Sequence, residues 1–121
     1  MTLRPESFIG FYPCRDLERT TAFYRALGLK IARDQGSCVI FRVVRSRFLG
    51  FCQHDEVPQH PGIILTLVLD HVDGAYGRLT GLGVHTEAPP GQNDRFGIYH
   101  FFARDPDGYR LELQRFDEPL S

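Results

Sequence analysis

The sequence predicts an α+β fold in which a strand-helix-strand-strand-strand unit occurs twice in one domain of 121 residues. The first observation is that both helical segments carry apolar residues at i, i+3, i+7 and i+10, one face of a helix. The second is an internal repeat. Subtracting 55 from the residue number matches the two copies: Val72 with Leu17, Leu79 with Tyr24, Leu82 with Leu27, Gly83 with Gly28 and Ile64 with Ile9. Because each copy must bury an open face, we expect a ligand cavity between them.

Module one is predicted to span residues 7–53. Residues 7–13 form an apolar run with strand character. Asp16 stands at the N-cap of the first helix, Glu18 in its first turn complements the helix dipole, and Gly28 suits the position just after its end. Three short strands are expected to follow, at residues 30–34, 37–43 and 47–53.

Module two is predicted to span residues 62–116, after a polar, proline-containing linker at 54–61. A strand at 62–69 precedes a helix that starts near Val72 and ends at Gly83. Gly74 and Gly77 each weaken this helix by about 1 kcal/mol relative to Ala. A short strand is expected at 84–88 and a polar loop at 89–95, which either closes over the cavity mouth or is an ordinary connection.

The last segment, residues 97–116, predicts a β-hairpin. Asp105, Pro106 and Gly108 occupy the positions that these residue types prefer in a type I turn. In the second strand, leucines alternate with polar residues, so Glu112 lies on the face opposite Leu111 and Leu113. Glu112 is therefore either a solvated surface carboxylate or a ligand or base that faces a cavity.

Composition excludes several classes of function. The net charge is −1 and the sequence has no basic run, so we expect no nucleic-acid or anionic-membrane partner. The longest apolar run, residues 63–69, is too short to span a bilayer, and the N-terminus has no apolar signal segment. Cys14, Cys38 and Cys52 have no C-x-x-C spacing, and we interpret them as reduced thiols of a cytoplasmic protein.

Three segments resemble the vicinal oxygen chelate superfamily, which includes glyoxalase I, extradiol dioxygenases and the fosfomycin- and bleomycin-resistance proteins. They are DLERTTAFYRALGL from Asp16, DHVDGAYGRLTGLGV from Asp70 and FFARDPDGYRLEL from Phe101, and together they cover nearly the whole chain. The resemblance implies two βαβββ modules in a pseudo-twofold repeat. It also implies that they form an open, barrel-like mixed sheet around a central cavity, commonly in a homodimer.

The metal-dependent members of the superfamily place their ligands at positions that can be matched here. These positions fall on Ile9 and Ile64, and the glutamate ligand of the last strand falls on Glu112. A fourth position lies around Leu49 or Phe51. Isoleucine has no lone pair to offer, and catalytic sites of this class need about three protein ligands. The resemblance therefore implies no metal at the usual site, although a displaced divalent metal using Glu112 with His100 or Gln53 stays open.

Strand alternation predicts an apolar and aromatic pocket with a few polar groups. The expected ligand-binding residues are Ile9, Phe11, Leu49, Phe51, Gln53, Ile64, Thr66, Tyr99, Phe101, Arg110 and Glu112.

Our leading interpretation is a cytoplasmic, homodimeric, metal-free protein that sequesters an apolar or aromatic small molecule. The alternative is an enzyme of the same superfamily, of lyase, isomerase or dioxygenase type, in which Glu112 is an acid or base or binds a displaced metal. A second titrating group bonded to Glu112 would favour the enzyme. A third possibility is a structural module whose own side chains fill the cavity.

Overall fold

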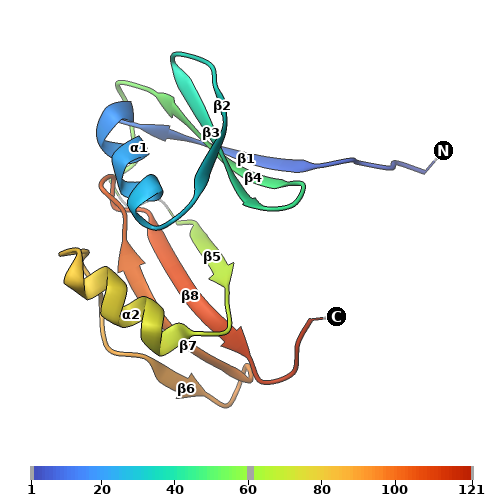
Figure 1. Cartoon of the computed structure of the whole chain (residues 1–121), viewed down its shortest axis with the longest axis vertical. Helices are drawn as coiled ribbons and strands as arrows, with labels where there is room; N and C mark the ends of the chain where they lie inside the picture. The colour runs from blue at the N-terminus through green and yellow to red at the C-terminus, as the bar shows by residue number, and fades with distance from the viewer. Residues whose placement is uncertain (1, 60–61, 121) are drawn as a thin grey trace. The chain divides into compact units, whose positions relative to one another are not determined.

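The computed structural model describes residues 2–59 and 62–120. The chain divides into two compact units, residues 1–58 and 59–121, and each contains one βαβββ module (Figure 1). The boundary falls inside the predicted linker, of which His60 and Pro61 lie outside the described residues. No helix among the described residues is long and apolar enough to cross a membrane.

Module one is a four-stranded mixed sheet with one helix against it. Its strands stand in the order β1-β4-β3-β2, with β1 parallel to β4 and the other pairs antiparallel. Tyr24 of the helix is fully buried and stacks on Phe51, with ring centroids 4.6 Å apart. The elements are β1 (Phe8–Cys14), α1 (Leu17–Ala26), β2 (Lys30–Asp34), β3 (Cys38–Val44) and β4 (Arg47–Gln53).

Module two repeats this topology in the order β5-β8-β7-β6, with β5 parallel to β8. The helix packs through Tyr76 against Phe101, at a centroid distance of 5.3 Å. The predicted α+β class and the two βαβββ modules are thus confirmed. The elements are β5 (Ile64–Val68), α2 (Val72–Gly81), β6 (Gly91–Asn93), β7 (Ile98–Arg104) and β8 (Arg110–Phe116).

The helix ends follow the predicted capping chemistry. The Asp16 side chain accepts a hydrogen bond from the Arg19 backbone N–H at 3.1 Å. Gly28 and Gly83 follow the two helices with φ of +102° and +78°, a backbone region that strains residues with a Cβ. Helix α2 forms despite its internal glycines because Val72 and Leu79 are buried against the sheet.

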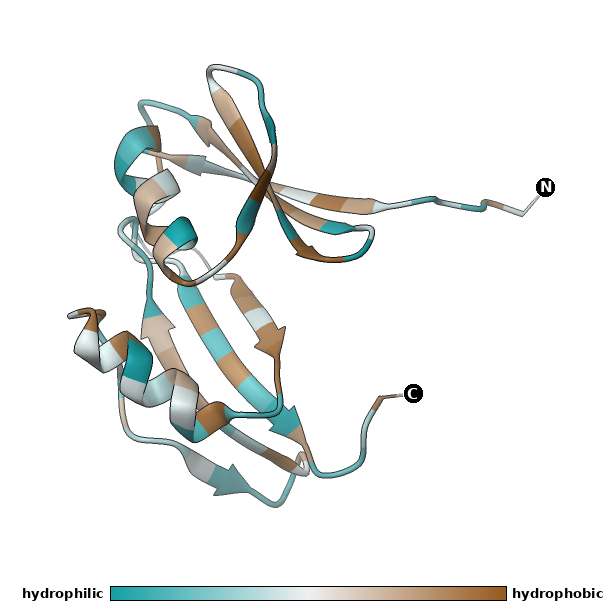
Figure 2. Cartoon of the chain, viewed as in Figure 1, coloured by the Kyte–Doolittle hydropathy of each residue, from teal (hydrophilic) through white to brown (hydrophobic). Residues whose placement is uncertain are grey.

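The hairpin turn also forms as predicted. The Gly108 N–H donates to the Asp105 carbonyl at 3.0 Å, and the Asp105 side chain accepts from the N–H groups of Asp107 and Tyr109. Figure 2 shows the alternation of hydrophilic and hydrophobic residues along β8 that the sequence predicted. Leu111 and Leu113 are buried, whereas Glu112 lies on the opposite face.

The prediction for residues 84–95 was wrong in detail. Residues 84–88 form no regular strand. They contact β7 through isolated interactions: Thr86 forms a β-bridge with Ala103, and the Glu87 N–H donates to the Phe102 carbonyl. The strand lies at residues 91–93, inside the segment predicted to be a loop. Pro89 and Pro90 separate the two stretches because neither has an N–H to donate to β7.

The expectation of three reduced thiols was also wrong. Cys38 and Cys52 face each other across β3 and β4 and form a disulfide, whereas Cys14 is buried and takes no part in it. Val57 of the predicted linker packs against module one. Val57 is buried, and its carbonyl accepts a hydrogen bond from Arg15 at 2.8 Å.

Candidate functional site

The face of the module-two sheet that lies opposite α2, called the open face below, carries three cross-strand rows of side chains. Strand pairing aligns Ile64 with Arg110 and Arg104, Thr66 with Glu112 and Phe102, and Val68 with Gln114 and His100. Ile64 and Val68 are 46% and 56% exposed, which is high for aliphatic side chains on a sheet. The open face therefore combines exposed apolar groups with a central polar cluster.

Glu112 is the centre of that cluster. Its Oε1 accepts a hydrogen bond from the Thr66 hydroxyl at 2.8 Å, and its Oε2 lies 2.6 Å from His100 Nδ1. With the amide nitrogen of Gln114 turned toward the carboxylate, that nitrogen donates to both oxygens at 3.0 Å. The Glu112 side chain is 12% exposed and that of His100 18%. Hydrogen bonds to a carboxylate at these distances are strong, so the cluster holds Glu112 in one orientation.

Arg110 shares this face with Glu112, as predicted, but pairs with a different carboxylate. Its guanidinium makes two 2.9 Å hydrogen bonds to Glu87 and lies 3.5 Å above the Phe102 ring. The hydrogen bonding from Arg110 is the main reason that the pKa of Glu87 lies below its ordinary value. Arg104 lies 3.3 Å from the same carboxylate. Arg110 therefore lines the site beside Phe102 and pairs with Glu87, and it is not the counter-ion of Glu112.

Tyr99 and Phe101, predicted to share the face of Glu112, lie on the opposite face. The β7–β8 register pairs Phe101 with Leu113, and Phe101 is buried against α2. The Tyr99 hydroxyl donates to Asp73 of α2 at 2.5 Å, and this hydrogen bond raises the pKa of the Tyr99 phenol. His100 and Phe102 occupy the open face in their place.

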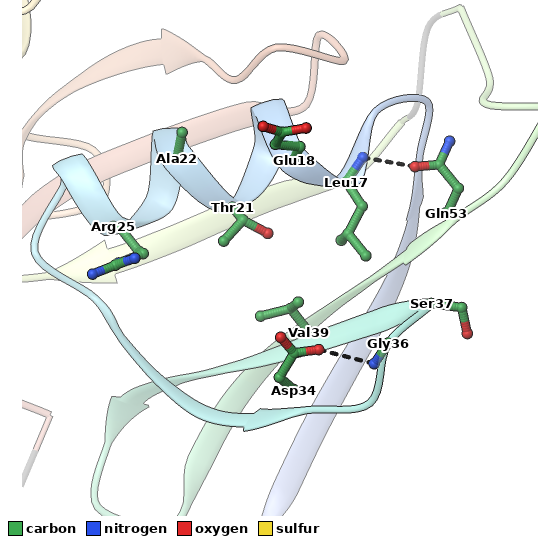
Figure 3. A pocket seen from close by; sticks show the side chains of 10 residues that line it. All are labelled: Leu17, Glu18, Thr21, Ala22, Arg25, Asp34, Gly36, Ser37, Val39 and Gln53. Atoms are coloured by element: carbon green, nitrogen blue, oxygen red, sulfur yellow. Dashed lines mark hydrogen bonds between the residues drawn. The ribbon is translucent and has the colours of Figure 1, made fainter.

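In module one, too, some predicted site residues lie on the helix side of the sheet. They are Leu49, Phe51 and Gln53, on the α1 side. Phe51 is core, stacked on Tyr24. The Gln53 side chain caps the start of α1, where it accepts from the Leu17 N–H at 2.7 Å (Figure 3) and donates to the Arg15 carbonyl. Gln53 also lines a groove of about 620 Å³ beside α1. We therefore assign Phe51 and Gln53 structural roles.

Ile9 and Phe11 lie on the corresponding face of the module-one sheet, the one opposite α1. Their side chains are 38% and 50% exposed. The register places Phe11 opposite Gly50 in the way that Thr66 lies opposite Glu112. Gly50, and not Leu49 or Phe51, is thus the module-one equivalent of Glu112. A Cβ built on Gly50 would lie 2.5 Å from the Phe11 ring, so this ring occupies the space above Gly50.

The donor set does not fit the divalent-metal site of the metal-dependent members of the superfamily. Ile9, Ile64 and Gly50 supply no side-chain donor at the matched positions. The Glu112 oxygens already face three side-chain hydrogen-bond partners. Across residues 2–59 and 62–120, no group of three or more His, Cys, Asp or Glu side chains is arranged to hold a metal ion. A site for a catalytic metal normally needs about three such ligands.

A pocket of about 470 Å³ adjoins the cluster at the edge of the module-two sheet. It lies where Pro89 and Pro90 interrupt the pairing to β7, and its lining includes His100 and Phe102. Gly91 stands directly opposite His100 in the β6–β7 register, so the position across from the imidazole carries no side chain. This volume is within the usual range for small-molecule sites.

Comparison with known proteins identifies the family. Residues 9–113 match the model of the Glyoxalase/Bleomycin resistance protein/Dioxygenase superfamily, which is most of the chain. The chain belongs to this superfamily. A search of curated proteins finds no match.

Three solved structures illustrate the similarity of fold. An integron cassette protein from the mobile metagenome of the Halifax Harbour sewage outfall has a TM-score of 0.79 at 18% identity, over 91% of this chain and 97% of that one. A glyoxalase/bleomycin resistance protein/dioxygenase from Nocardioides has a TM-score of 0.77 at 19% identity, over 98% and 87%. A bleomycin resistance determinant encoded on the transposon Tn5 has a TM-score of 0.75 at 24% identity, over 91% and 97%.

Proposed function

We propose that this superfamily member is a metal-free protein that binds and sequesters an apolar or aromatic small molecule on the open face of module two. The observation that supports it most is the Glu112 carboxylate, which Thr66, His100 and Gln114 hold in one orientation between exposed aliphatic side chains. A few oriented polar groups within an apolar surface are typical of small-molecule sites. The lack of donors at the matched ligand positions supports the metal-free part of the proposal.

A thermal-shift screen of aromatic and cationic small molecules tests this proposal. We expect hits that raise the Tm of the wild type but not that of a Glu112→Gln variant, because the substitution removes the carboxylate that orients the polar cluster of the site. Glu18→Gln is the matched control: Glu18 lines the groove beside α1 in module one. Hits that disappear only in Glu18→Gln would move the site to that groove and contradict the proposal. Each shift is measured against the variant's own ligand-free Tm.

A second candidate is an enzyme that uses the His100–Glu112 pair for acid–base chemistry. The 2.6 Å contact between two titratable side chains favours it, because a base oriented by a carboxylate is a common catalytic arrangement. Incubation of each hit with the protein, followed by mass spectrometry, separates the two candidates. Conversion that is lost in both His100→Gln and Glu112→Gln would support the enzyme, and recovery of every hit unchanged would support sequestration.

We also propose that the chain forms a homodimer, the state that the family resemblance implies. Exposed apolar residues on the module-one sheet, Phe8, Ile9 and Phe11, supply surface for such contacts. Sedimentation equilibrium is expected to give twice the mass of the chain, and a monomer at micromolar concentration would contradict the proposal.

A further inference from the structure

The His100–Glu112 contact defines which atom of the cluster is presented to a ligand. An ionised carboxylate only accepts hydrogen bonds, so the imidazole nitrogen that faces it, Nδ1, carries the proton. In the neutral ring, Nε2 is then the hydrogen-bond acceptor. Within residues 2–59 and 62–120, no hydrogen bond reaches Nε2, and no buried side-chain nitrogen or oxygen lacks a partner. Nε2 is therefore exposed to solvent.

The surroundings of His100 leave room for a ligand beside the ring. Apart from Gly91 and its two chain neighbours, no heavy atom of the described residues would lie within 4 Å of a Cβ built on Gly91, and Gly91 and His100 line the same pocket. Phe102 adds an aromatic wall, with its ring 5.1 Å from the imidazole. The guanidinium of Arg110, which is itself bound to Glu87, also lies over the Phe102 ring.

The Glu112 oxygens are less available to a ligand than Nε2. Thr66 and Gln114 face Oε1, and His100 and Gln114 face Oε2. A carboxylate has about four lone-pair sites, and four contacts of this kind use all of them. A ligand could bond to Glu112 only by displacing a partner that lies at 2.6 to 3.0 Å.

We infer that His100 Nε2 is the contact atom of the site and that Glu112 is a positioning residue that holds the imidazole in the Nδ1–H tautomer. The ligand is then a neutral, flat molecule with an O–H or N–H group that donates to Nε2 while its apolar part lies beside Phe102 and Gly91. This inference rests on the proposed function, because it assigns the atoms of the same site.

The tautomer can be measured without any ligand. Nitrogen-15 NMR of the imidazole side chains distinguishes a protonated Nδ1 from a protonated Nε2. We expect His100 to be Nδ1-protonated at neutral pH in the wild type, and a mixture of tautomers in Glu112→Gln, because a neutral amide can offer either an oxygen or an N–H to the ring. A merely structural Glu112 would leave the tautomer unchanged in that variant. An Nε2-protonated His100 in the wild type would overturn the inference, whatever the ligand screen finds.

A pair of probes tests the contact itself. 2-Naphthol carries an O–H donor, and 2-methoxynaphthalene has the same rings without it. We expect 2-naphthol to bind about tenfold more tightly, the effect of one hydrogen bond, and to shift the Nε2 resonance of His100. His100→Leu should abolish the difference between the probes, whereas His54→Gln, in the linker after module one, should keep it. Equal binding of both probes, or of neither, would overturn the assignment of Nε2 as the contact atom.

Gly91→Val tests the space beside the ring while it keeps every polar group. Gly91 has no positive φ, and a β-branched residue suits an edge strand, so the variant should fold with an unchanged circular dichroism spectrum. We expect it to weaken 2-naphthol at least about tenfold, through steric exclusion from the pocket. Retained affinity in a folded Gly91→Val protein would place the ligand elsewhere and overturn the inference.

Discussion

Asp105 links the turn to the two strands that carry His100 and Glu112, and its replacement by Ala should destabilise module two strongly. Its Oδ1 accepts hydrogen bonds from Asp107 N–H at 2.8 Å and from Tyr109 N–H at 2.9 Å. All three residues are buried, with exposures of 6%, 5% and 1%. Water therefore cannot easily replace the lost acceptor.

The expected loss of stability follows from the two backbone N–H groups, of Asp107 and Tyr109, that lose their acceptor. Each buried N–H that loses its partner costs about 1–3 kcal/mol, so Asp105→Ala should lower the free energy of unfolding by about 2–4 kcal/mol after some relaxation of the turn. That is a large part of the about 5–15 kcal/mol that stabilises a typical domain. Asp105→Asn keeps an acceptor oxygen at the same place. It should cost only about 1 kcal/mol, because hydrogen bonds to a charged acceptor are roughly twice as strong as neutral ones.

Urea unfolding followed by far-ultraviolet circular dichroism measures both variants, since the chain has no Trp for fluorescence. A free energy of unfolding for Asp105→Ala within about 0.5 kcal/mol of the wild type would refute the reasoning. So would an Asp105→Asn variant that is as unstable as Asp105→Ala, because the backbone N–H groups would then not be what Asp105 satisfies.

Three further predictions concern charge and redox state. The pKa of Glu87 is lowered by Arg110, so this carboxylate stabilises the fold fully above its ordinary pKa of 4.5, and the contribution is lost as the pH falls through the lower folded-state pKa. Urea titrations are expected to show less acid destabilisation in Glu87→Gln than in the wild type; equal pH dependence would contradict this. Tyr99 donates to Asp73, which raises the phenol pKa, so ring NMR should show Tyr99 ionising at lower pH in Asp73→Asn, and an unchanged midpoint would contradict it. A non-reducing peptide map should link the β3 and β4 cysteines and show Cys14 outside that link, reacting with thiol reagents only after denaturation because it is buried; a map without the link would contradict the disulfide.

Local chemistry explains why most of the fold was predictable. Asp16, Gly28 and Gly83 mark helix ends through interactions with their own neighbours in sequence, and the Asp-Pro-Asp-Gly turn forms for the same reason. The interrupted edge of the module-two sheet was not predictable in this way. Whether residues 84–88 or 91–93 pair with β7 depends on the position of Pro89 and Pro90 against another strand.

The prediction assigned the wrong β7 residues to the face of Glu112 because it treated the two hairpin strands separately. The turn itself contained the missing information. A type I turn followed by a glycine with positive φ makes a three-residue loop, which pairs Asp105 with Tyr109. Counting outward from that pair places His100 and Phe102, not Tyr99 and Phe101, on the face of Glu112.

The disulfide could not be found by counting in the same way. A register shift between Arg42 and Val44 separates the β3–β4 turn from Cys38 and Cys52. This irregularity changes by one residue which side chains lie opposite each other, and the sequence carries no clear signal for it. The spacing of the cysteines therefore did not reveal their pairing.

The most direct test of the metal-free proposal is the metal content per chain. The protein would be purified without a histidine tag and analysed by elemental mass spectrometry, before and after incubation with Mn, Ni, Zn and Fe(II) and removal of unbound metal. We predict no stoichiometric metal under any of these conditions, because only Glu112 survives among the matched ligand positions. One tightly held ion per chain, lost in Glu112→Gln, would contradict the proposal and make a metalloenzyme the leading interpretation.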